Sequence, residues 1–291
     1  MQKYLYLILL SVLIPACSPG AGKSAAGGKR VLTVTIEPQR YLLDRIVGDL
    51  FTVNTLVPPA TSPETYEPAP SVMVELGKSE IYFMVGDLGF ENAWSKRLAE
   101  NNPDVTLVNC SEGIALMEEH DHDHGHAHCG ADPHVWSSPQ AVKLFVRNML
   151  NALVKADPGN AEVFRANFDA FSAKIERTDS LIRDLLRDAP SRSFIIYHPA
   201  LAYFARDYGL HQLSIEFEGK SPSPSQIREL VDAARKEKIN TVFIQRGFDT
   251  KNAAVVAQEV GAEVFEIDPL RYEWDEELLK IAAVLARKTD E

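Results

Sequence analysis

Four residues of the types that bind transition metals follow predicted strands. Glu64 and His134 lie in the first half of the chain, and His198 and Asp268 lie in the second half. In open α/β sheets ligands bind beyond the carboxyl ends of the strands, so these side chains are expected to meet across a cleft between the halves. Each residue alone has a simpler explanation, as a hydrogen-bonded polar group or, for Asp268, as part of an Asp-Pro turn. Together they favour a shell of imidazole and carboxylate ligands, which suits zinc or manganese.

The elements that must position these residues follow from periodicity. Short β-branched runs alternate with amphipathic stretches in two blocks, separated by two consecutive helical tracts at 139–155 and 161–187. This pattern predicts an α/β fold of two four-unit lobes with parallel sheets, joined by a long helix, with the site in the cleft between the lobes. The predicted strands are 31–36, 51–57, 81–85, 105–109, 194–197, 211–217, 241–245 and 262–267. The predicted helices within the lobes are 41–47, 71–76, 93–99, 200–208, 225–236, 252–260 and 276–287.

The domain boundaries follow from the same pattern. We expect an N-terminal lobe over 31–157, a linking helix over 158–190 and a C-terminal lobe over 191–291. A chain of 291 residues is long enough for two such bodies, each with its own core.

The N-terminus has the pattern of a secretory signal. A short positive start precedes an apolar run that is too short to span a bilayer, so residues 1–16 are predicted to be a signal peptide. The segment 14–17, IPAC, resembles a bacterial lipobox, which makes Cys17 the expected lipidation site; the alternative is a plain signal peptide with an incidental cysteine. Residues 17–30, rich in Gly, Ala and Ser, are expected to be a flexible tether. The protein is therefore predicted to be a membrane-anchored lipoprotein on the periplasmic or cell-surface side.

The formal charge of −11, from 30 Lys and Arg against 41 Asp and Glu, bears on the binding partner. An acidic chain without a basic run is a poor nucleic-acid binder, because phosphate contacts dominate that affinity. A small cation is the more natural ligand.

Five of the eight histidines fall within nine residues of the segment 118–128, EEHDHDHGHAH. Neither a core period nor an amphipathic period explains this composition, so we interpret the segment as an auxiliary metal-binding loop. The alternative is an incidental polar loop. The histidines are His120, His122, His124, His126 and His128.

Cys110 and Cys129 bracket the His-rich loop. With Cys17 lipidated, two thiols remain in an oxidising compartment, which favours a disulfide between them. Alternatively, a reduced Cys129 joins the metal ligands of the loop. His211 has no motif around it and is interpreted as structural.

Around the four candidate ligands the chain resembles the ZnuA/TroA-like metal-binding subunits of bacterial ABC importers. The resemblance runs from about residue 31 to the C-terminus. It implies two α/β lobes joined by a rigid helix, with one metal ion between them held by residues at the positions of Glu64, His134, His198 and Asp268. The matching segments are SPETYEP (62–68), DPHVW (132–136), YHPALAYF (197–204) and DPL (268–270), with GKSPS (219–223) and TVFIQ (241–245) as further family-like segments.

The chain departs from the usual family pattern at the first ligand, where Glu64 replaces a histidine. A glutamate can ligate zinc, but a shell of two nitrogens and two carboxylates also suits manganese or iron. The His-rich loop favours zinc, since zinc-binding members often carry such a loop. Gln245 stands where many relatives carry Glu, which removes a negative charge near the site.

The resulting prediction is a monomeric solute-binding lipoprotein that captures Zn²⁺ and delivers it to an ABC permease, with Mn²⁺ or Fe²⁺ as the alternative ion. A zinc hydrolase with Glu64 as general base is the second hypothesis. It is disfavoured because the sequence has no His-Glu-x-x-His pattern or nucleophile motif, and because four side-chain ligands would leave no open position. A zinc buffer without a transporter is the third hypothesis.

Overall fold

The computed structural model describes residues 29–118, 130–216, 220–246 and 250–287. Within these residues, eight strands form two four-stranded sheets, with orders β2-β1-β3-β4 and β6-β5-β7-β8, and every pairing within the sheets is parallel. The strands of the first sheet are β1 (Arg30–Val34), β2 (Phe51–Thr55), β3 (Ile81–Met84) and β4 (Thr106–Asn109). Those of the second are β5 (Ser193–Ile196), β6 (His211–Ser214), β7 (Thr241–Gln245) and β8 (Glu263–Ile267).

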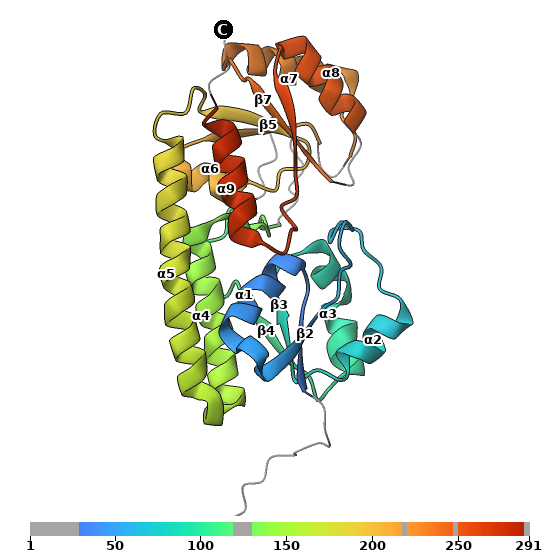
Figure 1. The fold of residues 1–291 in the computed structure, drawn as a ribbon. Coiled ribbons are helices and arrows are strands. Elements are labelled where there is room, and N and C mark those ends of the chain that lie inside the picture. The colour runs from blue at the N-terminus through green and yellow to red at the C-terminus, as the bar shows by residue number, and fades with distance from the viewer. Residues whose placement is uncertain (1–28, 119–129, 217–219, 247–249, 288–291) are drawn as a thin grey trace, which may run out of the picture.

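Helices cover the sheets and connect the two lobes (Figure 1). The α-helices are α1 (Glu37–Val47), α2 (Pro70–Leu76), α3 (Gly89–Asn101), α4 (Pro139–Ala156), α5 (Ala161–Leu186), α6 (Ala202–Tyr208), α7 (Pro224–Lys236), α8 (Thr250–Val260) and α9 (Trp274–Leu285). Short 3₁₀ turns are η1 (Gly48–Leu50), η2 (Val135–Ser137) and η3 (Pro158–Asn160). The predicted architecture of two four-strand parallel lobes with a long connecting helix is confirmed.

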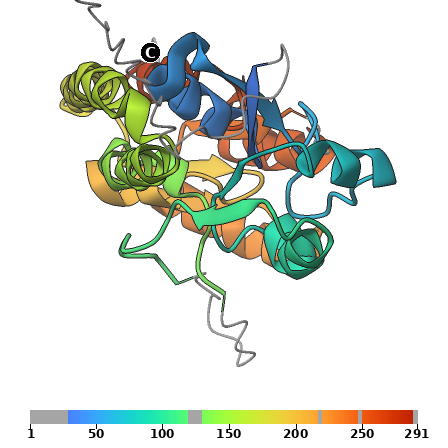
Figure 2. The ribbon, with the colours of Figure 1, turned by 90° about the horizontal axis from the view of Figure 1, so that it is seen from below.

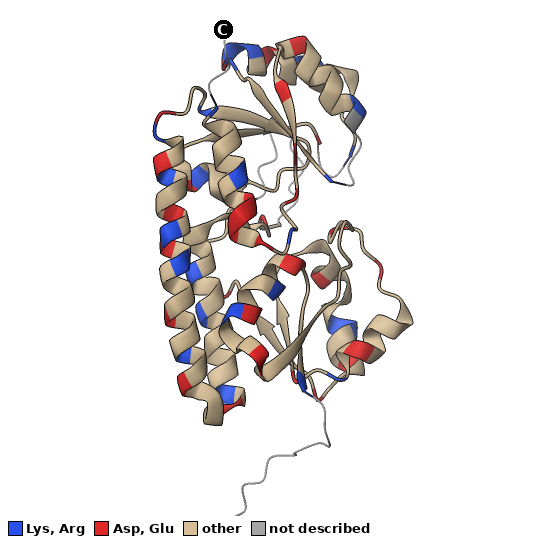
Figure 3. Cartoon of the chain, viewed as in Figure 1, with Lys and Arg blue, Asp and Glu red and all other residues tan. Residues whose placement is uncertain are grey.

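The helix α5 is the long helix that connects the two lobes. Its 26 residues span about 39 Å and pack against α4, α1 and α9. Seen from below, α4 and α5 lie beside each other to one side of the strands (Figure 2). Acidic and basic residues alternate along the outer surfaces of these two helices (Figure 3), so their polar faces are solvated while their apolar faces pack inward.

The start of α1 differs from the prediction. The helix begins at Glu37 rather than Tyr41, and the preceding strand ends at Val34 rather than Ile36. The buried Gln39 side chain causes this early turn, because its Oε1 accepts hydrogen bonds from the backbone N–H groups of Thr35 (2.9 Å) and Ile36 (3.3 Å). A glutamine that bonds the chain before its own helix acts as a cap, and hydrophobic periodicity does not detect it.

The hydrophobic core divides at the C-terminal sheet. Phe194 and Ile196 of β5 belong to the large core that includes the N-terminal lobe, whereas Ile195 and the adjoining Tyr197 belong to a smaller core against α7 and α8. Alternate residues of a strand face opposite sides of its sheet, so residues 194–196 of β5 are all apolar because both faces of the strand are covered. In the part of the chain that the structure describes, no helix is both long and apolar enough to cross a membrane.

Candidate metal centre

Three of the four predicted ligands meet in one place. Ligand atoms of Glu64, His134 and His198 all lie within 4.8 Å of one another. Glu64 lies in the loop after β2 and His134 directly precedes η2, whereas His198 comes two residues after β5 of the other lobe. They line a cavity of about 50 Å³, which the fourth candidate, Asp268, also lines.

The two imidazole rings face each other across the cleft. The Nε2 atoms of His134 and His198 are 3.2 Å apart, and the ring centroids are 5.1 Å apart. Two nitrogens bound to one tetrahedral zinc ion at 2.0–2.1 Å would be about 3.3 Å apart. The spacing of the two nitrogens therefore suits a shared ion.

A carboxylate orients each ring from behind. His134 Nδ1 lies 2.8 Å from Asp132 Oδ1, and His198 Nδ1 lies 2.9 Å from Glu216 Oε2. A carboxylate oxygen accepts the Nδ1–H hydrogen bond, and in this tautomer Nε2 is the ring atom that can ligate a metal ion. Asp132 Oδ1 also accepts the backbone N–H of His134 at 2.8 Å, which holds ring and backbone together.

Gln245 holds the backbone of His198 through both ends of its side-chain amide. Its Oε1 accepts the N–H of His198 at 3.1 Å, and its Nε2 donates to the carbonyl oxygen of His198 at 2.5 Å. A glutamate at this position could accept but could not donate. The Gln245 amide therefore lacks the negative charge of a glutamate and, in addition, fixes the end of β5 from which His198 projects.

The carboxylate of Asp268 lies in the same cavity but outside the three-residue cluster. Its Oδ1 accepts the N–H of Leu270 at 3.2 Å, and its Oδ2 lies 4.0 Å from Nη1 of Arg246. Arg246 also bonds Glu266 through its Nε, at 3.3 Å. A guanidinium beside a candidate ligand is a cation that competes with a metal ion for the same oxygen.

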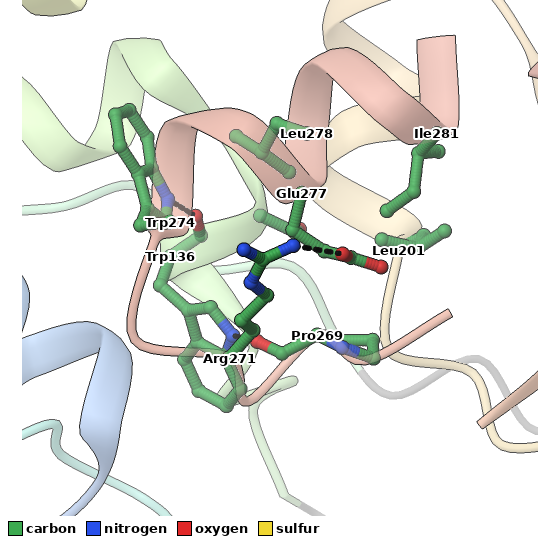
Figure 4. Close-up of a pocket in the computed structure, with 9 residues that line it drawn as sticks. Trp136, Leu201, Pro269, Arg271, Trp274, Glu277, Leu278 and Ile281 are labelled. Carbon is green, nitrogen blue, oxygen red and sulfur yellow. Dashed lines mark hydrogen bonds and ion pairs between the residues drawn. The ribbon is translucent and has the colours of Figure 1, made fainter. Parts of the chain in front are cut away.

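The segment that follows His134 is bonded to the segment that follows Asp268 (Figure 4). Trp136 Nε1 donates to the carbonyl oxygen of Pro269 at 2.9 Å, and Trp274 Nε1 donates to the carbonyl oxygen of Trp136 at 2.6 Å. Two indoles thus join the lobes immediately behind the site. They couple the position of His134 to that of Asp268.

Glu277 supports Asp268 from within α9. Its Oε1 accepts the backbone N–H of Asp268 at 2.7 Å, and its Oε2 lies 4.0 Å from Nη1 of Arg271 (Figure 4). The Glu277 residue is 3% exposed, so its carboxylate is sheltered from solvent.

Several predicted residues lie away from the cluster or outside the described part of the chain. The signal peptide with Cys17, the five histidines of the loop and Cys129 lie outside the described residues, so the predictions about them stay predictions. Cys110 is buried, makes no disulfide with any described residue, and has a pKa raised well above its ordinary value by burial. His211 pairs with Glu237 at the surface, at 2.8 Å, in keeping with a structural role.

The sequence interpretation missed the supporting residues Asp132, Glu216 and Arg246. Glu216 follows β6, which pairs directly with β5. The strand was predicted to run to residue 217, whereas it ends at Ser214, so the rule that found His198 at a strand end placed Glu216 inside the strand and missed it. Asp132 lies inside a segment already singled out. Arg246 follows β7 directly and could have been found by the rule that found His198.

The chain matches one protein family along most of its length. Residues 32–281 match the family described as ZnuA, zinc-uptake complex component A, periplasmic. The high-affinity zinc uptake system protein ZnuA of Bacillus subtilis is 30% identical over 273 residues, covering 89% of this chain and 85% of that protein. The manganese-binding lipoprotein MntA of Halalkalibacterium halodurans is 28% identical over 272 residues, covering 89% and 86%.

Solved structures show the same architecture. A crystal structure of ZnuA is 37% identical and superposes with a TM-score of 0.83, covering 89% of this chain and 98% of that one. A zinc-bound ZnuA deletion mutant, also 37% identical, has a TM-score of 0.82 and covers 89% and 97%.

Proposed function

Because the chain belongs to the ZnuA family of periplasmic zinc-uptake components, we propose that it captures Zn²⁺ outside the cytoplasm and delivers it to an ABC permease. The metal-binding, solute-binding class follows from the family. The identity of the ion, the ligand set and the anchor are parts of the proposal. The ligands are Glu64, His134, His198 and Asp268.

The observation that carries the proposal is the arrangement of His134, His198 and Glu64. Two Nε2 atoms lie 3.2 Å apart, each ring is held by a carboxylate, and a third ligand atom lies within 4.8 Å. Two imidazoles and carboxylate oxygens form a donor set that zinc accepts in tetrahedral geometry. Support for a metal ion also comes from Glu64 Oε1, a buried oxygen that accepts no hydrogen bond from any described residue.

Manganese is the alternative ion, with iron as a further member of the same class. Glu64 and Asp268 would supply two hard oxygen ligands, which suit manganese better than a shell rich in histidine. Relatives named for zinc, manganese and iron all match this chain. The facing imidazoles favour zinc, because manganese prefers a larger number of oxygen ligands.

A lipid anchor at Cys17 is part of the proposal, and so is a monomeric state. Relatives named as manganese-binding lipoproteins match along most of their length, and the apolar N-terminus with its IPAC segment is the feature of this chain that supports an anchor. Such a chain would hold its metal site at a membrane surface beside the permease.

A zinc hydrolase is the weaker interpretation. A general base must reach a water on an open metal position. In this site one oxygen of Glu64 already accepts the N–H of Gly89, and Asp268 also lines the cavity. Both features favour a closed shell for capture over an open one for catalysis.

Calorimetry with Zn²⁺ and Mn²⁺ on the metal-free full chain tests the proposal. We expect one tight site that prefers Zn²⁺ and that is lost in both His134→Ala and His198→Ala, because each removes a nitrogen ligand. His211→Ala is the matched control, since His211 also bonds a carboxylate through Nδ1 but lies away from the cavity. Retention of wild-type affinity by both cavity variants would exclude this site.

A further inference from the structure

The two carboxylate oxygens of Glu64 have different surroundings. Oε2 accepts the backbone N–H of Gly89 at 3.0 Å. Oε1 is buried and accepts no hydrogen bond from any described residue. A buried oxygen without a donor is unfavourable unless a cation or another group satisfies it.

Gly89 approaches Glu64 more closely than any other residue type could. A Cβ atom at position 89 would lie 2.6 Å from Glu64 Oε2, 2.6 Å from its carbonyl oxygen and 3.0 Å from its Cα. Gly89 is the first residue of α3, so its N–H has no partner within the helix and is available to the carboxylate. The adjacent Phe90 N–H donates to the carbonyl oxygen of Pro63 at 2.9 Å, which makes a second bond between the same two segments.

The segment that carries Gly89 is itself held from inside the lobe by Glu91. The Glu91 carboxylate accepts the N–H groups of Val85 at 2.7 Å and Gly86 at 2.6 Å, and it also accepts the hydroxyl of Thr35. Glu91 is 3% exposed. Gly89 is therefore a fixed donor rather than part of a loop that adapts to its ligand.

We propose that Gly89 makes Glu64 a one-oxygen metal ligand, with Oε2 retained by the backbone and only Oε1 available to the ion. The inference rests on the proposed function, because it concerns the same metal site. One oxygen from Glu64 keeps the coordination number low, and a low number favours tetrahedral Zn²⁺ over Mn²⁺, which takes more oxygen ligands. Gly89 is thus a specificity-determining residue that does not touch the metal.

Glu64→Gln tests which oxygen is available. An amide has one oxygen and one N–H₂ group. If Gly89 N–H retains the amide oxygen, the N–H₂ group must face the ion and cannot ligate it. We expect Glu64→Gln to bind Zn²⁺ as weakly as Glu64→Ala in calorimetry on the full chain. Glu64→Gln binding clearly more tightly than Glu64→Ala would overturn the inference, because the amide oxygen would then be free to reach the metal.

Gly89→Ala tests the same contact between Gly89 and Glu64 by changing the residue that donates the hydrogen bond. We expect Zn²⁺ affinity to fall about 10- to 100-fold, as for loss of a group that orients a ligand, and the ratio of Zn²⁺ to Mn²⁺ affinity to fall with it. Gly77→Ala is the matched control, because its Cβ would also meet a side-chain oxygen at 2.6 Å, that of Asn102, away from the site. Equal metal affinities in the two alanine variants, both shown to be folded by thermal unfolding, would overturn the inference.

The failure of the proposed function has a different signature. If the cavity is not the metal site, His198→Ala leaves Zn²⁺ binding unchanged. If only the role of Gly89 is wrong, His198→Ala abolishes binding while Gly89→Ala behaves like Gly77→Ala.

Discussion

Replacing Glu216 by glutamine tests how the protein prepares His198 for a metal ion. Glu216 Oε2 lies 2.9 Å from His198 Nδ1, and the Glu216 side chain is only 10% exposed. A glutamine side chain has nearly the same shape and retains an oxygen that can accept the Nδ1–H bond. The substitution therefore removes the charge from the contact while it keeps the geometry.

The expected loss of affinity follows from the change in the hydrogen bond. A bond to a charged group contributes about 1.5–3 kcal/mol and a neutral one about 0.5–1.5 kcal/mol, so the difference is about 1–1.5 kcal/mol. Since about 1.4 kcal/mol corresponds to a factor of ten, Zn²⁺ affinity should fall about tenfold in Glu216→Gln. Glu216→Ala should bind still more weakly, because Nδ1–H loses its acceptor and the ring loses its orientation.

Isothermal calorimetry with a competing chelator, on the metal-free full chain at neutral pH, measures this loss. Glu237→Gln is the matched control, because Glu237 Oε2 lies 2.8 Å from His211 Nδ1 in a similar pair outside the site. The control should bind Zn²⁺ like the wild type. If Glu216→Gln also binds like the wild type while folding normally, the carboxylate does not prepare the ligand and the reasoning is wrong.

Three other perturbations give separate outcomes. Arg246→Ala should tighten metal binding, because it removes a cation 4.0 Å from the Asp268 carboxylate. Equal or weaker binding in calorimetry would contradict the idea that the guanidinium competes with the metal ion for this carboxylate. Burial raises the pKa of Glu91 from its ordinary 4.5 to about 7, so the folded state binds more protons than the unfolded state between these values. Stability should therefore fall on the order of 3 kcal/mol as the pH rises from about 4.5 to 7, and denaturant titrations of Glu91→Gln should lack this decline if the assignment is right. Deletion of residues 118–128 should lower the metal stoichiometry but preserve one tight site. Metal binding by this segment should fade between about pH 7 and 5.5, because the imidazoles protonate. A stoichiometry that the deletion leaves unchanged under metal excess would show that the segment has no metal-binding role.

The sequence by itself predicted the architecture, which the structure confirms, and it indicated residues for a metal site. Periodicity placed the strands and most helices, because a strand covered on both faces carries a run of apolar residues, as at 194–196 in β5. Strand-end positions and residue types indicated four candidate ligands, Glu64, His134, His198 and Asp268. Sequence patterns suffice to predict strands, helices and strand ends, because these depend on neighbouring residues and on the hydrophobic periods of helices and strands.

Only the tertiary structure decided which groups act together at atomic distance. The alignment of His134 and His198 depends on the indole bonds of Trp136 and on carboxylates that lie behind each ring. The pairing of Asp268 with Arg246, and the retention of one Glu64 oxygen by Gly89, join segments far apart in the chain. Such contacts arise from packing between lobes and loops, where shifts of less than an ångström change which oxygen is bonded. Residue type and spacing carry no record of those distances, so the sequence indicated candidate ligands, while the folded packing determined how each of these side chains is held.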